Sequence, residues 1–171
     1  MSEIKAIFEG AREHIRKHPQ DGIGTAVTYT AVRDGVTCDV RDSHWQLVAD
    51  EMPDDGGAGL GPDPGVFARA ALGSCLAMGY VFWAAHLDVP LHGVAVTVET
   101  DYDARGILGV DDAVPPGWSA VRYKVELQSD APEARLREMV EMADRYSSIL
   151  DCLRRPLAVT REVVVSPRPR P

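Results

Sequence analysis

The residues that decide the fold read PGVFARAALGSCLAMGYVFWAAHL and run from Pro64 to Leu87. They carry no formal charge between Ala70 and Ala85, and small residues alternate with large ones on every side. A helix that is apolar around its whole circumference belongs inside a protein, so the stretch predicts a buried helix around which the chain is organised. Gly73 and Gly79 each cost about 1 kcal/mol against alanine in a helix interior, which favours a close approach of another backbone. One thiol, Cys75, lies at the middle.

The remaining composition is typical of a single soluble domain. The chain has 171 residues, of which 45% are hydrophobic and 26% charged. The formal net charge of -8 disfavours nucleic acid and anionic membrane surfaces as partners. The uncharged stretch is rich in Gly and Ala and falls short of the roughly 20 large apolar residues that a membrane span needs. No basic segment followed by an apolar run opens the sequence, so we expect neither a signal peptide nor a membrane partner.

The cysteines indicate a reducing compartment. There are three, Cys38, Cys75 and Cys152, far apart in the sequence, with no CxxC pair and no histidine pair nearby. An odd number at such spacing predicts neither a disulfide framework nor a zinc site. We therefore expect no metal and no cofactor, and a cytoplasmic location. Cys38 falls in a predicted strand and is interpreted as a small packing residue.

Residues 1–20 are expected to form an N-terminal helical extension. Ser2 to Lys17 has a helical period, and His18-Pro19 with Asp21-Gly22 ends it. His14 and His18, near its basic end, are interpreted as solvated, because a metal-ligand role lacks partners. One apolar stripe is predicted on this helix: Ile4, Ile7, Phe8, Ala11 and Ile15.

A three-stranded antiparallel meander is predicted next. Its strands are residues 25–32, 36–40 and 45–49, and Asp34-Gly35 is a two-residue hairpin signal between the first two. The glycine- and proline-rich segment 54–65 predicts a flexible loop. It is not a phosphate-binding loop by its sequence, because it lacks the GK[ST] ending and a preceding parallel strand.

The C-terminal half alternates strands and helices. Residues 94–98 and 121–127 alternate apolar and polar side chains, which predicts a hairpin across the polar segment 101–117. Ser129 to Glu133 reads as a helix start. The face of that helix carries Leu136, Met139, Val140, Ala143 and Tyr146, and Ser147 continues it.

The end of this helical segment has two interpretations. Ser147 either continues the apolar face of the same helix or, together with Ser148, caps a short second helix. A final strand is predicted at 157–165 and a disordered tail at 166–171, which leaves 21–165 as the main domain. The fold class is therefore mixed α+β. One small sheet covers a helix on one side only, and two chains that bury each other's helix would complete the core.

The residues alone leave the role of Cys75 open. A thiol is a nucleophile only as a thiolate, which needs a nearby cation or a helix N-terminus. Cys75 lies in the middle of its predicted helix, so that helix's own N-terminus does not activate it. Buried structural thiols are common, and an inert packing role is the simpler interpretation.

Several motifs together resemble the OsmC/Ohr family, the osmotically inducible and organic hydroperoxide resistance proteins. Gly61-Pro62-Asp63-Pro64 followed by the AALGSCLA run of 70–77 matches the family signature. The resemblance covers most of the chain from about Thr25 to Val165. It continues in 50–53, Gly56-Gly57, 103–109, 129–133 and Leu153-Arg154-Arg155-Pro156.

The resemblance implies both an architecture and a chemistry. It implies an intertwined homodimer in which antiparallel sheets wrap around long central helices of both chains. Active members reduce small-molecule hydroperoxides, and Cys75 matches their peroxidatic cysteine, which becomes a sulfenic acid. Arg33 matches by position the arginine that polarises the site, although the hairpin turn alone also explains Arg33-Asp34-Gly35.

Two family positions differ in this sequence. Gly65 occupies the position of the family's acid, and Ser147 the position of its second, resolving cysteine. A hydroxyl cannot form a disulfide with a sulfenic acid. Cys152 can take the place of the resolving cysteine only if the helix is broken between Ser147 and Cys152.

These departures leave two functions. One is a one-cysteine peroxidase, in which Cys75 and Arg33 are the catalytic residues and an external thiol reduces the oxidised Cys75. The other is a non-peroxidatic protein that binds an apolar small molecule at the dimer interface. A purely structural dimer is the third interpretation.

Overall fold

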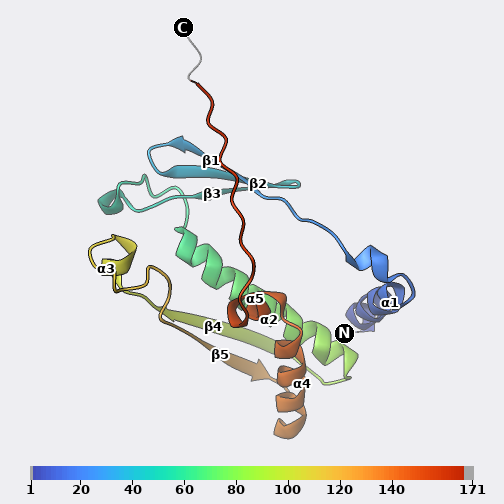
Figure 1. The fold of residues 1–171 in the computed structure, drawn as a ribbon. Coiled ribbons are helices and arrows are strands. Elements are labelled where there is room, and N and C mark those ends of the chain that lie inside the picture. The colour runs from blue at the N-terminus through green and yellow to red at the C-terminus, as the bar shows by residue number, and fades with distance from the viewer. Residues whose placement is uncertain (1, 168–171) are drawn as a thin grey trace.

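The computed structural model describes residues 2–167, with side chains from residue 3 onward. It is a mixed α+β fold with antiparallel sheets and one long helix, as predicted (Figure 1). The helices are α1 (Ser2–Lys17), α2 (Pro64–His86), α3 (Ala104–Ile107), α4 (Glu133–Arg145) and α5 (Ser148–Arg154). The strands are β1 (Tyr29–Asp34), β2 (Thr37–Asp42), β3 (Trp45–Ala49), β4 (Gly93–Asp101) and β5 (Ala120–Gln128), and short 3-10 turns lie at Pro19–Gly22 and Pro53–Asp55.

The central helix α2 has a well-defined N-terminus directly after the glycine- and proline-rich loop. Asp63 caps it by accepting a 2.9 Å hydrogen bond from the Val66 N–H, and Pro64 occupies the first turn, where its missing N–H costs nothing. The helix then runs between the β4–β5 hairpin and the β1–β2–β3 sheet (Figure 1). By length and composition α2 would suffice to cross a membrane, but core helices meet the same criterion, and α2 packs on β4 and α4.

The hydrophobic core lies on one face of α2. Leu72, Leu76 and Tyr80 recur every fourth residue and are almost completely buried. They pack against Met139 and Ala143 of α4, against Leu150 of α5 and against the inward face of the hairpin. The opposite face is not buried within this chain, since Met78 is 57% exposed and Phe82 37%. A helix predicted to be enclosed on all sides is thus covered on one.

The two helix glycines have different surroundings. A Cβ at Gly73 would lie 3.4 Å from Val98 Cγ2 and 4.0 Å from the carbonyl oxygen of Val96, so α2 and β4 approach closely there, as predicted. A Cβ at Gly79 would meet nothing within 4 Å. Gly79 instead borders a cavity, and the expected backbone contact is not made within the described chain.

The β4–β5 hairpin is regular. Its antiparallel register runs from Gly93 opposite Gln128 to Asp101 opposite Ala120. Val94, Val96 and Val98 of β4 and Tyr123, Val125 and Leu127 of β5 pack toward the core, and the intervening residues face outward. The predicted alternation is therefore confirmed. The connecting segment contains the short helix α3, which the polar composition did not indicate.

The predicted meander is present, but β1 begins at Tyr29 rather than Thr25. Val32 pairs with Cys38 and Asp34 with Thr37, so Arg33 is the extra residue of a bulge. Large apolar side chains of this sheet are exposed: Tyr29, Val32, Trp45 and Leu47. Within one chain, this sheet covers little of the core.

The glycine-rich loop is held in place rather than flexible. Asp50 is 2% exposed and accepts hydrogen bonds from the backbone N–H groups of Glu51, Ala58 and Leu60. The bond from Leu60 is the largest cause that holds the pKa of Asp50 below its usual value. A Cβ at Gly57 would lie 2.0 Å from the Glu51 carbonyl oxygen, and one at Gly61 would lie 2.2 Å from that of Val48. Only glycine fits these two positions, because the backbones touch.

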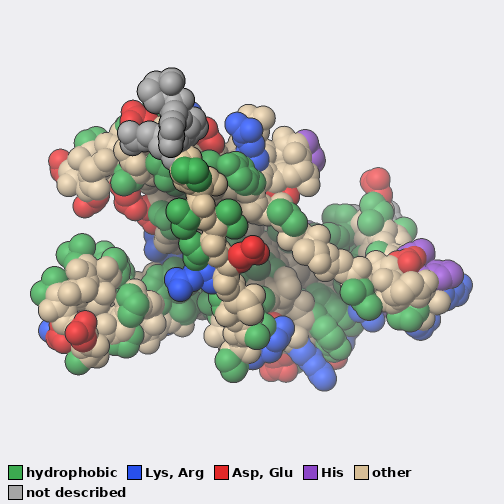
Figure 2. All heavy atoms as spheres, turned by 45° about the horizontal axis from the view of Figure 1, so that its top comes forward, with side chains coloured by type: hydrophobic (Ala, Val, Ile, Leu, Met, Phe, Trp, Pro, Cys, Tyr) green, Lys and Arg blue, Asp and Glu red, His purple; other side chains and the backbone are tan. Residues whose placement is uncertain are grey.

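The predicted final strand at 157–165 is wrong for the described chain. Residues 157–167 form no helix or strand, since no other strand lies alongside to share a hydrogen-bond ladder. They leave α5 and run past the β1–β2–β3 sheet (Figure 1), and Val159 is 90% exposed. Figure 2 shows hydrophobic side chains on the surface around this segment. Of the predicted tail at 166–171, residues 168–171 lie outside the described part.

Candidate functional site

Cys75 opens into a cavity of about 510 Å³. The cavity lies where the uncovered face of α2 meets the junction of α4 and α5 and the middle of α1. Most of its lining is apolar, and two of its hydroxyl groups, those of Ser147 and Ser148, lie beside the thiol. The lining residues are Phe8, Ala71, Ser74, Cys75, Met78, Gly79, Phe82, Trp83, Ala143, Tyr146, Ser147, Ser148 and Ile149.

Two serines from the α4–α5 junction lie against the thiol. Ser147 Oγ is 3.3 Å from Cys75 Sγ, and Ser148 Oγ is 3.8 Å away. Ser147 is 6% exposed, and Cys75 itself is half-buried rather than sealed in hydrocarbon. The structure thus brings Cys75 and Ser147 together, 72 residues apart in sequence. A cysteine side chain at 147 would lie within reach of the same sulfur.

The position of Ser147 follows from a helix break. α4 ends at Arg145, and Ser147 is the N-cap of α5, where its Oγ accepts a 3.4 Å hydrogen bond from the Leu150 N–H. The predicted restart of the helix at Ser147-Ser148 is confirmed. Because the cap uses a lone pair of the hydroxyl, its proton is free to point at the sulfur.

These contacts favour the thiolate. Burial is the largest single influence and raises the pKa of Cys75, but hydrogen bonds act against it. They come from the Ser147 hydroxyl, from the Ile149 backbone, and from the hydroxyl and backbone of Ser148. Together they hold the pKa of Cys75 below its ordinary value. Sequence reasoning missed these donors because they lie at the start of α5, and it considered only a cation, Arg33, and the N-terminus of the helix that carries the thiol.

The structure does not bring Arg33 to the cavity within one chain. Arg33 lies in the β1 bulge, where its Nη1 is 3.2 Å from Asp39 Oδ1 and its side chain is 48% exposed. Among residues 3–167, no arginine or lysine lines the cavity. The polar surroundings of the thiol are therefore hydroxyl and backbone groups.

Gly65, at the position of the family's acid, lies in the first turn of α2. A Cβ there would be 2.9 Å from Asp63 Oδ1 and 3.2 Å from Arg69 Nη1. Arg69 itself reaches across to Thr100 Oγ1 at 3.5 Å. A larger side chain at 65 would thus crowd the helix cap.

The other two cysteines lie outside the cavity. Cys152 is exposed on α5, and the helix break that was needed to turn it toward Cys75 does not place it among the lining residues. Its proposed resolving role stays a prediction. Cys38 is half-buried in β2, with Sγ 3.5 Å from the Val36 carbonyl oxygen, which agrees with a packing role.

A half-buried carboxylate anchors the junction that carries the serines. Asp144 accepts a 2.7 Å hydrogen bond from the Tyr80 hydroxyl of α2 and a 2.6 Å bond from the Tyr123 hydroxyl of β5. Burial first, and then this carboxylate, raise the pKa of both phenols, that of Tyr123 to about 12. The Ser147 N–H also bonds the Asp144 carbonyl oxygen at 3.3 Å. α2, β5 and the α4–α5 junction are therefore tied at one residue, which the sequence pattern did not single out.

An aromatic wall lines part of the cavity. The Phe8 ring of α1 stacks on Phe82 with centroids 5.3 Å apart and meets Trp83 edge-on at 5.5 Å. Trp83 stacks in turn on Tyr146 at 5.0 Å. The predicted apolar stripe of α1 is only partly buried, since Ile7 is 62% and Ile15 39% exposed.

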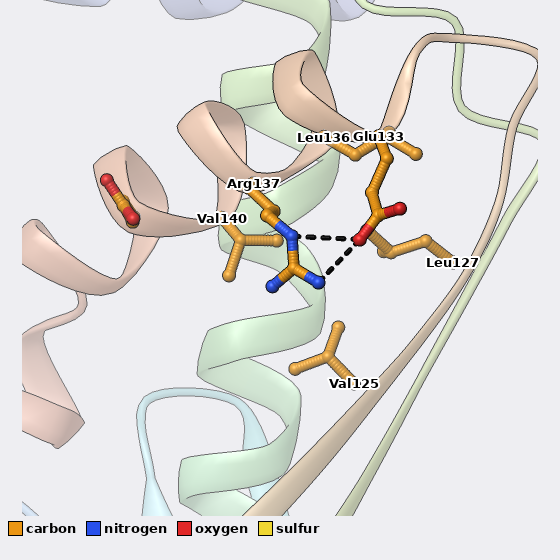
Figure 3. A pocket seen from close by; sticks show the side chains of 7 residues that line it. Val125, Leu127, Glu133, Leu136, Arg137 and Val140 are labelled. Carbon is orange, nitrogen blue, oxygen red and sulfur yellow. Dashed lines mark hydrogen bonds and ion pairs between the residues drawn. The ribbon is translucent and has the colours of Figure 1, made fainter.

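A second hollow, of about 370 Å³, lies between β5 and α4 (Figure 3). Val125, Leu127, Leu136 and Val140 form its floor, and Arg137 bonds Glu133 at its rim through Nε at 2.9 Å. This exposed i,i+4 pair is ordinary helix-surface chemistry, and the hollow contains no thiol or hydroxyl nucleophile.

Within the described residues, no group of three or more His, Cys, Asp or Glu side chains is placed to hold a metal ion. His14 and His18 lie near each other on the surface, with ring centroids 5.0 Å apart, and His14 bonds Asp21 at 2.8 Å.

Comparison with known proteins identifies the family. The sequence profile described as OsmC-like protein matches residues 56–162, more than half of the chain. No curated protein sequence matches significantly. An OsmC-like protein from Mycoplasma pneumoniae has a TM-score of 0.66 at 12% identity, covering 77% of this chain and 88% of that one.

Two solved structures named for hydroperoxide resistance share the fold. The organic hydroperoxide resistance protein OsmC from Legionella pneumophila has a TM-score of 0.52 at 16% identity, with 77% and 90% of the two chains covered. A Vibrio cholerae protein named for organic hydroperoxide resistance, with captopril in one of its active sites, has a TM-score of 0.54 at 16% identity, with 77% and 85% covered. At these identities the similarity shows the fold alone, and with the profile match it places the chain in the OsmC-like family.

Proposed function

We propose that this protein is a thiol-dependent reductase of organic hydroperoxides with Cys75 as its nucleophile. The observation that carries the proposal is a thiol with a lowered pKa, hydrogen-bonded by Ser147, that opens into an apolar cavity. A thiolate supplies the electrons, and the cavity accepts the organic group of the peroxide. Two neighbours in the fold are named for organic hydroperoxide resistance, which supports the same chemistry.

The proposed reaction needs only this one cysteine and an external thiol. The Cys75 thiolate attacks the distal peroxide oxygen, the O–O bond breaks, and the alkoxide leaves as an alcohol after taking a proton from water. The resulting sulfenic acid condenses with one external thiol and releases water. A second thiol then cleaves the mixed disulfide and restores Cys75. Ser147 cannot replace the external thiol, because a hydroxyl forms no disulfide.

We further propose that the active form is an intertwined homodimer in the cytoplasm. The uncovered face of α2, the exposed side of the β1–β2–β3 sheet and the apolar segment after α5 all present hydrophobic side chains that one chain leaves in water. A second copy would cover them. We propose that this second copy also supplies the Arg33 guanidinium at the cavity, in the catalytic role that the family resemblance implies.

Peroxide turnover tests the proposal directly. Wild-type protein and Cys75→Ser are compared with cumene hydroperoxide and hydrogen peroxide, using dithiothreitol or a lipoyl dithiol as reductant. We expect turnover in the wild type, none above background in Cys75→Ser, and full turnover in Cys38→Ser, whose thiol lies outside the cavity. Equal rates in the wild type and Cys75→Ser would remove the proposal.

Cys152 is tested in the same assay. If Cys75 works in a one-cysteine cycle, Cys152→Ser keeps its turnover, because Cys152 is exposed and outside the cavity. Loss of turnover in a folded Cys152→Ser protein would show that it resolves the sulfenic acid.

A second candidate function is binding of an apolar small molecule without turnover. It is favoured by the absence of lysine and arginine from the described cavity lining and by glycine at the acid position, 65. The captopril in one of the active sites of the Vibrio cholerae structure supports the view that this fold accepts a drug-sized molecule. Calorimetric binding of an apolar ligand that is equal in wild type and Cys75→Ser, together with no turnover, would favour this function.

A further inference from the structure

One wall of the Cys75 cavity comes from outside the matched family domain. Phe8 lies on α1, far before residues 56–162 that the family profile matches, and it is the only α1 residue in the described lining of this cavity. Its contribution to the cavity is therefore a property of the N-terminal helix of this chain.

The Phe8 ring is held by three other rings. It stacks on Phe82 at 5.3 Å and meets Trp83 and His86 edge-on at 5.5 and 6.0 Å. These are the offset-stacked and edge-to-face arrangements that aromatic rings prefer. Phe8 thus closes a continuous aromatic wall instead of projecting freely into the opening.

Polar contacts hold α1 on both sides of that ring. Lys5 pairs with Asp88 just after the end of α2, and Glu9 Oε1 lies 3.3 Å from His86 Nδ1. One turn beyond Phe8, the Arg12 guanidinium lies over the Trp83 ring at 5.0 Å. The helix is therefore fastened to α2 at the level of the cavity.

The cavity has a polar end and an aromatic end. Cys75 and the serines of the α4–α5 junction form the polar end, and Phe8, Phe82 and Trp83 form the aromatic one. Its volume of about 510 Å³ is that of a small-molecule site, far larger than hydrogen peroxide requires. A molecule whose reacting atom meets the sulfur would direct its remaining atoms along this wall.

We propose that Phe8 is a specificity-determining residue, which selects reactants with an aryl or bulky apolar group for Cys75. Its ring contacts that group while the reacting atom lies at Cys75 Sγ. The inference rests on the proposed function only in taking Cys75 as the reacting thiol. The selectivity belongs to the wall, so it is measurable with a reagent that is not a peroxide.

Competitive alkylation with N-phenylmaleimide and N-ethylmaleimide measures the selectivity that the aromatic wall gives to Cys75. In each case the Cys75 thiolate adds to one alkene carbon, the other takes a proton from water, and no group leaves. Peptide mass spectrometry reads the phenyl-to-ethyl ratio at Cys75 and, in the same sample, at Cys152. Cys152 is exposed and outside the cavity, so its ratio reports the intrinsic reactivity of the two reagents.

We expect the ratio at Cys75 to exceed that at Cys152 in the wild type. Phe8→Ala should lower the ratio at Cys75 by roughly three- to tenfold, the size of one aromatic contact, and leave that at Cys152 unchanged. Phe8→Leu should fall between them. The matched control is Ile7→Ala on the same helix, since Ile7 is 62% exposed and outside the cavity lining. An unchanged ratio in Phe8→Ala, or an equal fall in Ile7→Ala, would overturn the inference.

Peroxide turnover separates this inference from the proposed function. Phe8→Ala should lower kcat/KM for cumene hydroperoxide by roughly the same factor, and that for hydrogen peroxide by less than about twofold, because the small peroxide does not reach the wall. If the wild type shows no turnover while the maleimide ratio falls, peroxidase activity is refuted and the role of Phe8 stands. If turnover is present and neither selectivity changes in Phe8→Ala, only the role of Phe8 is refuted.

Discussion

The two sheets were both predicted from the sequence, and they have very different surroundings. In the β4–β5 hairpin, one face packs on α2 and α4 and contributes to the core. In the β1–β2–β3 sheet, Tyr29, Val32 and Trp45 are each more than 60% exposed. The sequence predicts strands in both sheets, but among the described residues only the hairpin has its covering helices within the chain.

The difference indicates which apolar surfaces one chain buries by itself and which it leaves exposed. The hairpin, α2, α4 and α5 form a core that one chain can maintain. The β1–β2–β3 sheet, the outer face of α2 and the extended segment 157–167 expose their apolar side chains together. Exposed apolar surface of this extent marks an interaction site, and a second copy is the occupant that we propose.

The largest effect is expected on the hairpin side. Leu76→Ala should lower the free energy of unfolding by about 2–5 kcal/mol, because a fully buried leucine leaves a cavity that its neighbours cannot fill. Chemical denaturation at fixed protein concentration measures it. The matched variant Leu108→Ala, at a residue that is 74% exposed, should cost little. A similar cost for both would mean that the core is not where the structure places it.

A smaller effect is expected at the anchor between the hairpin and the site. Tyr80→Phe removes the 2.7 Å hydrogen bond from the buried Tyr80 ring to Asp144 and leaves a half-buried carboxylate oxygen with one partner fewer. The free energy of unfolding should fall by about 1–3 kcal/mol. Tyr102→Phe, at a tyrosine that is 64% exposed, is the control and should be neutral. A neutral Tyr80→Phe would show that the Asp144 contacts are dispensable.

The unburied side is tested by association. Val159→Asp changes a side chain that is 90% exposed in one chain. If a second copy covers it, the dimer dissociation constant should rise at least about tenfold, or about 1.4 kcal/mol. Analytical ultracentrifugation over a dilution series measures it, with Thr97→Asp on the outer face of β4 as the control. Identical sedimentation of both variants and the wild type would leave the proposed dimer without support at this segment.

Between the two regions, Ser147→Ala tests the environment of the thiol. Loss of the hydrogen bond at 3.3 Å should raise the pKa of Cys75 and slow its alkylation by iodoacetamide near neutral pH by roughly tenfold. Ser148→Ala, whose hydroxyl is 3.8 Å away, should slow it less. Cys152 in the same sample serves as reference. Unchanged alkylation of Cys75 in Ser147→Ala would show that the hydroxyl does not stabilise the thiolate.

The smallest effect is a pH dependence of stability. Because the pKa of Cys75 is lower in the folded protein than in the unfolded chain, the stabilisation is present above the unfolded pKa and is lost as the pH falls through the folded one. The unfolding free energy should therefore rise with pH across that interval in the wild type relative to Cys75→Ser. Parallel curves for the two proteins would contradict the lowered pKa.

The sequence by itself determined most of the elements and which of their faces are apolar. The uncharged run predicted α2, Ser2 to Lys17 predicted α1, and alternation predicted the β4–β5 hairpin, because local periodicity records which side of an element is apolar. Strand-forming residues and the Asp34-Gly35 turn predicted the β1–β2–β3 sheet. The motif around Cys75 predicted the family. The short helix after Ser147 was one of two interpretations that the sequence allowed, since capping needs only neighbouring residues.

Tertiary structure decided which partners meet. It placed α5's donors at a thiol on α2, set Phe8 across the same cavity and joined Asp144 to two tyrosines from other elements. It also left the predicted strand at 157–165 without a neighbour. Contacts between residues far apart in the sequence depend on how whole elements pack, and a strand exists only with a second strand beside it, so no local pattern encodes either.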